Sequence, residues 1–86
     1  MRRRDLERVH FERACVGANV RAARQRAGLT RGELAAMLHT EGVTTLYEQA
    51  IGRLERGGRD LTLPEALVVA EVLAAPLEVL TEGLER

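Results

Sequence analysis

Residues 51–59 read IGRLERGGR, and this stretch has the pattern of the end of a helix followed by a turn. The paired glycines Gly57 and Gly58 stop the helix. We expect Gly57 at positive φ, because glycine enters the left-handed region without steric cost. Three arginines in nine residues suit a surface that meets a polyanion. A single acidic residue, Glu55, stands among them, and its sign needs a separate explanation.

Helix signals continue on both sides of this stretch. Upstream, Asp5–Gly28 carries apolar residues at a three-to-four spacing and ends at a glycine. Gly17 is a candidate break that would divide this segment into two helices. Three capping boxes of the type Thr-x-x-Glu mark further helix starts, at Thr30, Thr45 and Thr62.

These starts predict helices over 30–41 and 45–56, a third running from Thr62 to about residue 75, and a short last helix that Pro76 opens. No stretch has the alternation of a strand, and the apolar content is mainly Leu, Val and Ala. The sequence therefore predicts a single all-α domain of five to six helices.

Charge is distributed unevenly along a chain whose net charge is zero. Residues 1–31 carry nine arginines and three acidic residues, whereas residues 60–86 carry six acidic residues and one arginine. Binding of a polyanion depends on the local field rather than on the sum of charges. This dipole is compatible with nucleic-acid binding and equally with ordinary solvated helix faces.

At the level of whole segments, the sequence resembles helix-turn-helix proteins of the phage-repressor or xenobiotic-response-element (XRE) type. The matching segments are VRAARQRAGLTRGELAAML (20–38), IGRLERGGR (51–59) and LTLPEALVVAEVLAAPLEVL (61–80). The resemblance implies a compact five-helix, lambda-repressor-like DNA-binding domain. It also implies a transcriptional regulator, most simply a repressor, that binds a two-fold operator in double-stranded DNA as a homodimer.

The same resemblance offers a reason for Glu55. Proteins of this type pair an arginine late in the first helix with a glutamate late in the recognition helix, and the matching residues are Arg24 and Glu55. The pair would face inward and fix the recognition helix on its scaffold.

The resemblance also implies which residues meet DNA. Base edges would be contacted from the N-terminal, outward side of the recognition helix, by Glu48, Gln49, Gly52 and Arg53. Glu48 has a second possible role, as the last residue of the Thr45 capping box. The sugar–phosphate backbone would be contacted by arginines, a tyrosine hydroxyl and the amide of the glycine turn, at Arg31, Tyr47, Arg56, Gly58 and Arg59.

The sequence departs from the family pattern between its two central helices. Sixteen positions separate Ala35 from Ile51, more than the usual turn allows, so that helix two, the turn or both are lengthened. Such variants are typical of actinobacteria. The extra residues leave the register of the recognition helix open.

The N-terminal residues lie outside the family core. We expect a basic helical extension over 1–16, the helix-turn-helix domain over 17–83 and a short tail over 84–86. The extension is either an arm that touches phosphates or a helix that docks Val9 and Phe11 on the acidic C-terminal half of a second subunit.

Other functions have little support. His10 and His39 lie far apart without partner ligands, so no metal is expected, and Cys15 fits a small apolar residue rather than a redox switch. No nucleophile–base pair or paired carboxylates indicate an enzyme or a cofactor. No membrane span or signal peptide is present, which favours a cytoplasmic, nucleoid-associated protein. A second interpretation is a protein-interaction module whose acidic C-terminal half binds a partner protein.

Overall fold

The computed structural model describes residues 3–84, and five helices account for most of them. They are α1 (Arg3–Arg26), α2 (Arg31–Thr40), α3 (Glu48–Glu55), α4 (Leu63–Val72) and α5 (Leu77–Leu80). No strand occurs in this part of the chain. The all-α prediction is confirmed, and within residues 3–84 no helix has the length and apolar character needed to cross a membrane.

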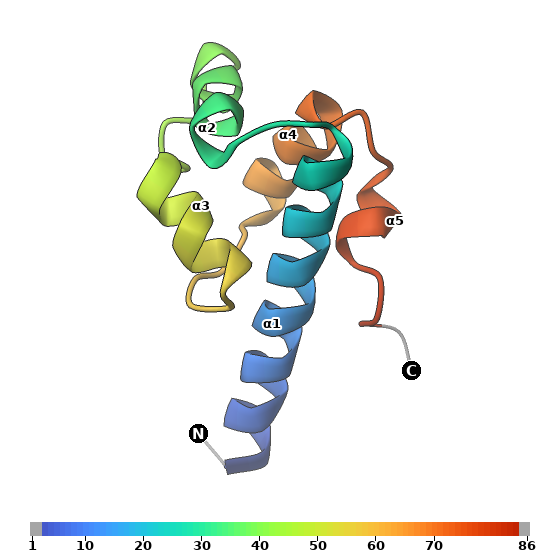
Figure 1. Ribbon diagram of the computed structural model, residues 1–86. Helices are drawn as coiled ribbons and strands as arrows, with labels where there is room; N and C mark the ends of the chain where they lie inside the picture. The colour runs from blue at the N-terminus through green and yellow to red at the C-terminus, as the bar shows by residue number, and fades with distance from the viewer. Residues whose placement is uncertain (1–2, 85–86) are drawn as a thin grey trace.

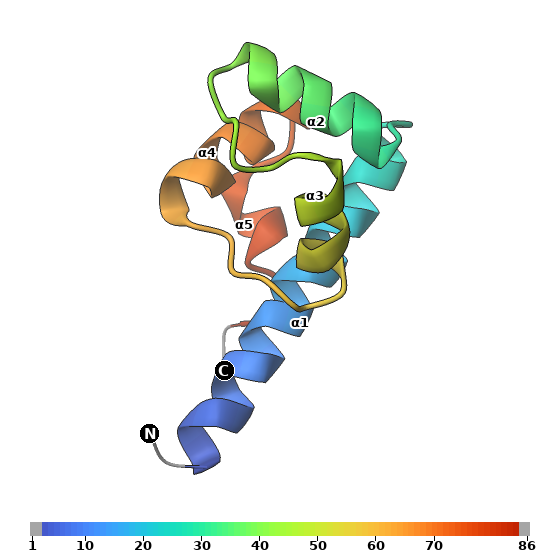
Figure 2. The ribbon, with the colours of Figure 1, turned by 90° about the vertical axis from the view of Figure 1, so that its left-hand side faces the viewer.

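The long helix α1 is the axis of the molecule. Its second half lies among the other four helices, whereas its first turns extend beyond them, as Figures 1 and 2 show. Helix α3 packs on one side of α1 and α5 on another, and α2 and α4 pack against each other. This arrangement leaves α2 and α3 side by side at one surface of the domain (Figure 2).

Gly17 does not break α1, which is continuous from Arg3 to Arg26. The residue is buried where α1 crosses the end of α3, and a Cβ atom there would overlap the carbonyl oxygen of Leu54. Gly17 is therefore needed for the close approach of two backbones. The expected boundary after residue 16 consequently falls inside a helix rather than between two elements.

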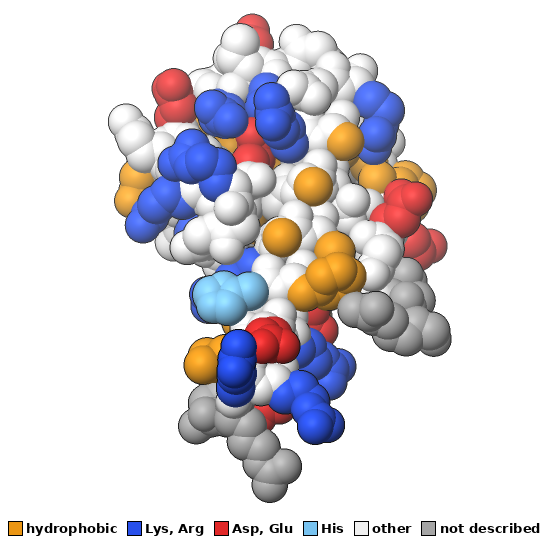
Figure 3. All heavy atoms as spheres, turned by 60° about the horizontal axis from the view of Figure 1, so that its bottom comes forward, with side chains coloured by type: hydrophobic (Ala, Val, Ile, Leu, Met, Phe, Trp, Pro, Cys, Tyr) orange, Lys and Arg blue, Asp and Glu red, His pale blue; other side chains and the backbone are white. Residues whose placement is uncertain are grey.

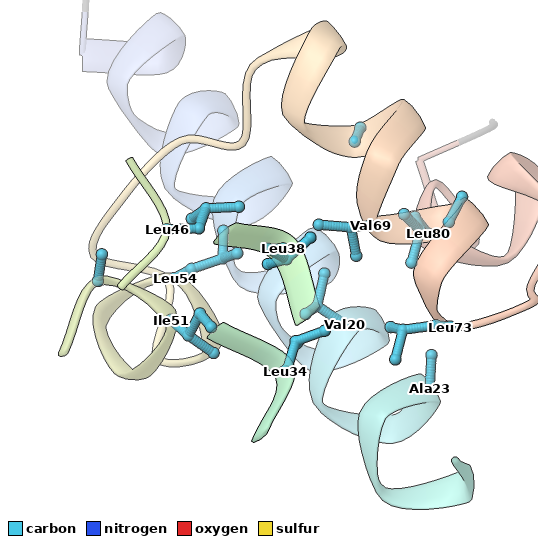
Figure 4. Close-up of a cluster of buried hydrophobic side chains, with 13 residues drawn as sticks. Val20, Ala23, Leu34, Leu38, Leu46, Ile51, Leu54, Val69, Leu73 and Leu80 are labelled. Atoms are coloured by element: carbon cyan, nitrogen blue, oxygen red, sulfur yellow. The ribbon is translucent and has the colours of Figure 1, made fainter. Parts of the chain in front are cut away.

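The hydrophobic core draws on every helix and on the turn between α2 and α3. Val20 of α1, Leu34 and Leu38 of α2, and Leu46 of the turn are at most 1% exposed. Ala50, Ile51 and Leu54 of α3 complete this cluster with residues of α4 and α5 (Figure 4). The apolar face of α3 is thus committed to the core, and its opposite face is left for solvent.

Helix ends follow the sequence signals in two of the three expected capping boxes. Thr30 and Thr62 each accept a hydrogen bond from the amide three residues later, and Glu33 and Glu65 accept in return. The Thr45 box is absent, because α3 begins only at Glu48, after an N-cap residue, Tyr47, whose side chain makes no capping bond.

The extra residues of this chain lie in the turn. Helix α2 ends at Thr40, and the connection to α3 runs over residues 41–47, longer than a usual helix-turn-helix turn. Gly42, at φ 89°, follows the end of α2, and Leu46 is buried in the core in a segment without regular secondary structure. Helix α3 thus begins two residues later than Thr45 as its N-cap would place it, and Leu46 packs into the core ahead of the helix.

Candidate nucleic-acid interface

Glu55 stands at the last position of α3 with its carboxylate almost completely buried. Arg24 holds both oxygens: its Nε donates to Oε2 at 2.6 Å and its Nη2 to Oε1 at 3.0 Å. The Nη1 atom of Arg24 donates to the carbonyl oxygen of Leu29 at 2.8 Å. Every nitrogen of this guanidinium is therefore engaged, and its side chain is only 9% exposed. The pair ties the end of α1 to the end of α3.

A second arginine reaches the same carboxylate from α2. The Nε of Arg31 donates to Oε1 of Glu55 at 3.0 Å, although the Arg31 side chain is 38% exposed. Burial acts to raise the pKa of Glu55, but the hydrogen bonds and charges of the two arginines lower it by more, so the pKa lies below its usual value. Glu55 is accordingly an anion at neutral pH that joins three helices.

Most of the residues expected to meet DNA lie around one shallow hollow between α2 and α3. The hollow has two walls, one from the first residue of α2 and one from the solvent face of α3. Its lining comprises Arg31, Glu48, Gln49, Gly52, Arg53 and Arg56. Three guanidinium groups and one amide thus converge on a surface that the core leaves free.

The floor of this hollow is formed by Gly52. This glycine is buried, and the Nη1 of Arg56 lies 3.2 Å from the position that a Cβ would take. Because Gly52 lacks a side chain, the guanidinium of Arg56 can fold back over α3 toward the hollow. Gly52 is therefore placed beneath the arginines, with Arg56 between it and solvent, rather than at the outer edge of the surface.

Tyr47 contacts Arg53, one of the residues that line the hollow. The Arg53 Nη2 donates to the Tyr47 hydroxyl at 3.3 Å, and both residues are exposed. Figure 3, in which α3 lies at the left, shows several arginine side chains gathered on that side and others over the N-terminal turns of α1. The arginines on the side of α3 are thus one of several groups of basic side chains on this face.

Glu48 is the acidic member of the hollow. It is the first residue of α3, so the capping role considered for it does not exist in the structure. Its Oε1 lies 3.0 Å from where a Cβ of Gly32 would stand, against the first turn of α2. A carboxylate at the N-terminal ends of two helices is favourably placed with respect to their dipoles.

Gly58 and Arg59 take other roles than those expected. The Gly58 amide donates to the carbonyl oxygen of Arg53 at 2.8 Å, and the Gly57 amide to that of Leu54 at 3.0 Å. These bonds close the end of α3, with Gly57 at φ 79° as the sequence predicts. The Gly58 amide is therefore used inside the protein and is not presented to a phosphate.

Arg59 is directed toward a second buried acid, Glu65 of α4. Its Nη1 and Nη2 donate to Oε1 at 3.1 Å and to Oε2 at 2.8 Å. The Nη1 atom also donates to the carbonyl oxygen of Asp60 at 2.6 Å. The Arg59 side chain is only 21% exposed, so the structure corrects its expected place among the outward arginines.

Glu65 also holds the lengthened turn. Its Oε2 accepts from the Thr45 hydroxyl at 2.5 Å, and its Oε1 from the Thr62 amide at 2.9 Å. The Arg59 hydrogen bonds, opposed by burial and helped by Thr45 and Thr62, lower the pKa of Glu65 to about 2. One carboxylate therefore fastens the turn before α3, the loop after α3 and the start of α4.

Sequence reasoning missed the links from Arg31 to Glu55 and from Arg59 and Thr45 to Glu65. The capping box at Thr62 already explains an acidic residue at position 65, and no local pattern indicates that Glu65 also binds Arg59 and Thr45. The partners of Glu65 come from loops whose meeting depends on the whole fold.

Comparison with known families bears directly on this surface. A helix-turn-helix family model matches residues 20–80, most of the chain. The chain belongs to this XRE-type helix-turn-helix family. Searches of curated proteins and of solved structures gave no match.

Membership of this family relates the hollow between α2 and α3 to the two helices of the helix-turn-helix motif. Helix-turn-helix proteins place the second helix of the motif in the major groove and cross the backbone with the first, and in this chain those helices are α3 and α2. The family is one of DNA-binding transcription regulators, not of enzymes.

Proposed function

We propose that this protein is a sequence-specific double-stranded DNA-binding repressor that acts as a homodimer on a two-fold operator. The observation that carries the proposal is the hollow between α2 and α3, where three arginines and Gln49 converge on the exposed face of the recognition helix. The apolar face of α3 is buried, so this face alone is left to enter a groove.

Individual contacts follow from side-chain chemistry. Gln49 and Arg53 lie on the exposed side of α3 and suit adenine and guanine respectively, each through two parallel hydrogen bonds in the major groove. Arg31, Arg56 and the Tyr47 hydroxyl suit phosphates at the rim of the hollow.

Glu48 belongs to the base-reading group on this proposal. An acid among arginines repels phosphate, and it favours a base that offers a donor, such as the N4 amino group of cytosine. We therefore assign Glu48 to selection of cytosine.

The dimer would use the extension of α1. Leu6 and Phe11 are 46% and 41% exposed on this part of the helix, which protrudes from the domain (Figure 1). One domain of this size contacts few base pairs, and two copies on half-sites about one helical turn apart would supply the specificity of a regulator. A dimer that covers its operator represses by excluding other proteins.

Selection of bound sequences from a random duplex pool tests the proposal directly. The expected product is a two-fold repeat, bound by the purified protein with an affinity that falls steeply as salt rises. A reporter gene carrying that sequence should be transcribed less when the protein is present. Recovery of no enriched sequence would overturn sequence-specific binding.

Sedimentation of the full chain and of a chain lacking residues 1–12 tests the dimer. The full chain should sediment as a dimer on its operator and the shortened chain as a monomer. A shortened chain that still dimerises would move the interface to the C-terminal helices near Leu77 and Leu80.

A second candidate is a protein-interaction module, which one feature of α4 favours. Leu63 and Leu67 are 66% and 53% exposed at a spacing of one helical turn, and the acidic Glu71 follows one turn later. Binding through such an apolar stripe would change little between low and high salt, in contrast to DNA binding.

A further inference from the structure

We infer that Glu55 is a positioning residue for DNA, because it holds Arg31 in a conformation ready to bind a phosphate. This inference rests on the proposed DNA binding and adds to it a division of labour between two arginines. Arg24 and Arg31 share one carboxylate, yet they differ in exposure, in the atoms engaged and in the surface that each one reaches.

The charges on this carboxylate do not balance. Two guanidinium groups surround one anion, so the cluster keeps one net positive charge. Arg24 is 9% exposed and all three of its nitrogens donate inside the protein. The excess charge is therefore presented to solvent by Arg31, whose side chain is 38% exposed and lines the hollow.

The hydrogen bond between Arg31 and Glu55 fixes the orientation of the Arg31 guanidinium group. Arg31 meets Glu55 through Nε at 3.0 Å. A guanidinium is planar and its five N–H donors have fixed directions. A carboxylate bound at Nε therefore orients the whole group, and its terminal nitrogens supply the donors for a phosphate oxygen at the hollow.

Such fixation matters for affinity. An arginine that is free in solution loses rotamer freedom when it binds, whereas Arg31 has lost much of that freedom already on folding. Arg56 offers the comparison within the same hollow, since its guanidinium lies against Gly52 and, within residues 3–84, is not hydrogen-bonded to the Glu55 carboxylate. Loss of Arg31 should accordingly cost more affinity than loss of Arg56.

Lysine variants separate orientation from charge. Duplex binding is measured by fluorescence anisotropy at several salt concentrations for the wild type, Arg31→Lys, Arg31→Ala, Arg56→Lys and Arg56→Ala. The probes are a selected operator and a mixed-sequence duplex of equal length. Lysine keeps the charge but has no planar fork to bridge Glu55 and a phosphate. Arg31→Lys should weaken binding to both probes roughly two- to tenfold while the salt dependence stays near that of the wild type.

Arg56→Lys is the comparison variant in the same hollow and should weaken binding less than Arg31→Lys does, because within residues 3–84 no carboxylate is hydrogen-bonded to the Arg56 guanidinium. A double-mutant cycle extends the test: Glu55→Gln should weaken duplex binding in the wild type and have a smaller effect in Arg31→Ala, where only its contact with Arg24 is left to lose. Circular dichroism at the assay temperature shows which variants are folded. If Glu55→Gln does not fold, the lysine pair alone decides.

Two results would overturn the inference. One is an Arg31→Lys protein with wild-type affinity, and the other is a Glu55→Gln effect that simply adds to that of Arg31→Ala. Both are distinct from failure of the proposed function, in which the wild type itself would bind neither duplex.

Discussion

Two buried glutamates, Glu55 at the end of α3 and Glu65 at the start of α4, are both neutralised by arginine. They differ in how much of the arginine stays exposed to solvent. Each is a nearly inaccessible carboxylate held by arginine. Glu55 binds two guanidinium groups, and one of them, that of Arg31, is 38% exposed at the hollow between α2 and α3. Glu65 takes one guanidinium, a hydroxyl and an amide, and it leaves Arg59 largely covered.

The difference shows that the number of arginines in a stretch does not give the number of guanidinium groups that it presents to solvent. Arg56 and Arg59 are three residues apart in the same glycine-containing segment. The first folds over α3 into the hollow, whereas the second is neutralised by Glu65. An acid on the next helix, six residues after Arg59, decides which of the two arginines faces outward.

Removal of each acid should give the largest effects and test how far the two clusters differ. Glu55→Ala leaves Arg24 buried without its partner and should lower the free energy of unfolding by about 3–5 kcal/mol. Glu65→Ala should cost less, because Arg59 is 21% exposed and can turn toward water. Urea unfolding of both variants measures the costs, and Glu71→Ala, at an exposed site of α4, should stay within about 0.5 kcal/mol of the wild type. Equal costs for Glu65→Ala and the control would show that the Glu65 cluster is not stabilising.

Acid should weaken the Glu65 cluster over a defined range. The pKa of this carboxyl is 4.5 ordinarily and about 2 in the folded protein. Because the folded state lowers the pKa, its stabilisation of about 3 kcal/mol is complete above pH ~5 and is lost as the pH falls from ~4.5 to ~2. The difference in unfolding free energy between the wild type and Glu65→Gln should shrink over this range. A difference that stays constant down to pH ~2.5 would contradict the lowered pKa.

Substitutions on the exposed face of α3 should affect sequence preference without touching either cluster. Gln49→Ala and Arg53→Ala should each relax discrimination at one base pair by about 1–3 kcal/mol. Competition binding with single-base variants of the selected operator measures this. Arg26→Ala, an exposed arginine at the end of α1, serves as control and should leave the preference unchanged. An Arg53→Ala protein with wild-type preference would mean that another register of α3 meets the bases.

The smallest expected effect is on the salt dependence of DNA binding, which should differ between variants of Arg56 and Arg59. Arg56→Ala should reduce the slope of log affinity against log salt by about 0.9, the value for one phosphate contact. Arg59→Ala should leave the slope unchanged and instead lower thermal stability, because Glu65 loses its partner. A fall in slope for Arg59→Ala would mean that Arg59 leaves Glu65 when DNA binds.

Several features of the fold could be predicted because their causes are local. Thr30 and Thr62 start helices through bonds to residues three positions later, and Gly57 ends α3 through its own backbone freedom. The start of α3 could not be found in this way. Thr45 has the same local pattern as Thr30, yet its hydroxyl donates to Glu65, twenty residues away.

The sequence by itself determined the helical class, the order of the helices, the apolar face of α3 and the family, since periodicity and helix-end chemistry act within a few residues. The tertiary structure alone decided that Gly17 lies at a helix crossing and that the extra residues form the turn. It also decided that Arg31 lines the exposed hollow between α2 and α3 while Arg59 binds Glu65. These outcomes depend on backbones and charges that meet only after the chain has folded, because a side chain's partner is set by position in space and not by its neighbours in sequence.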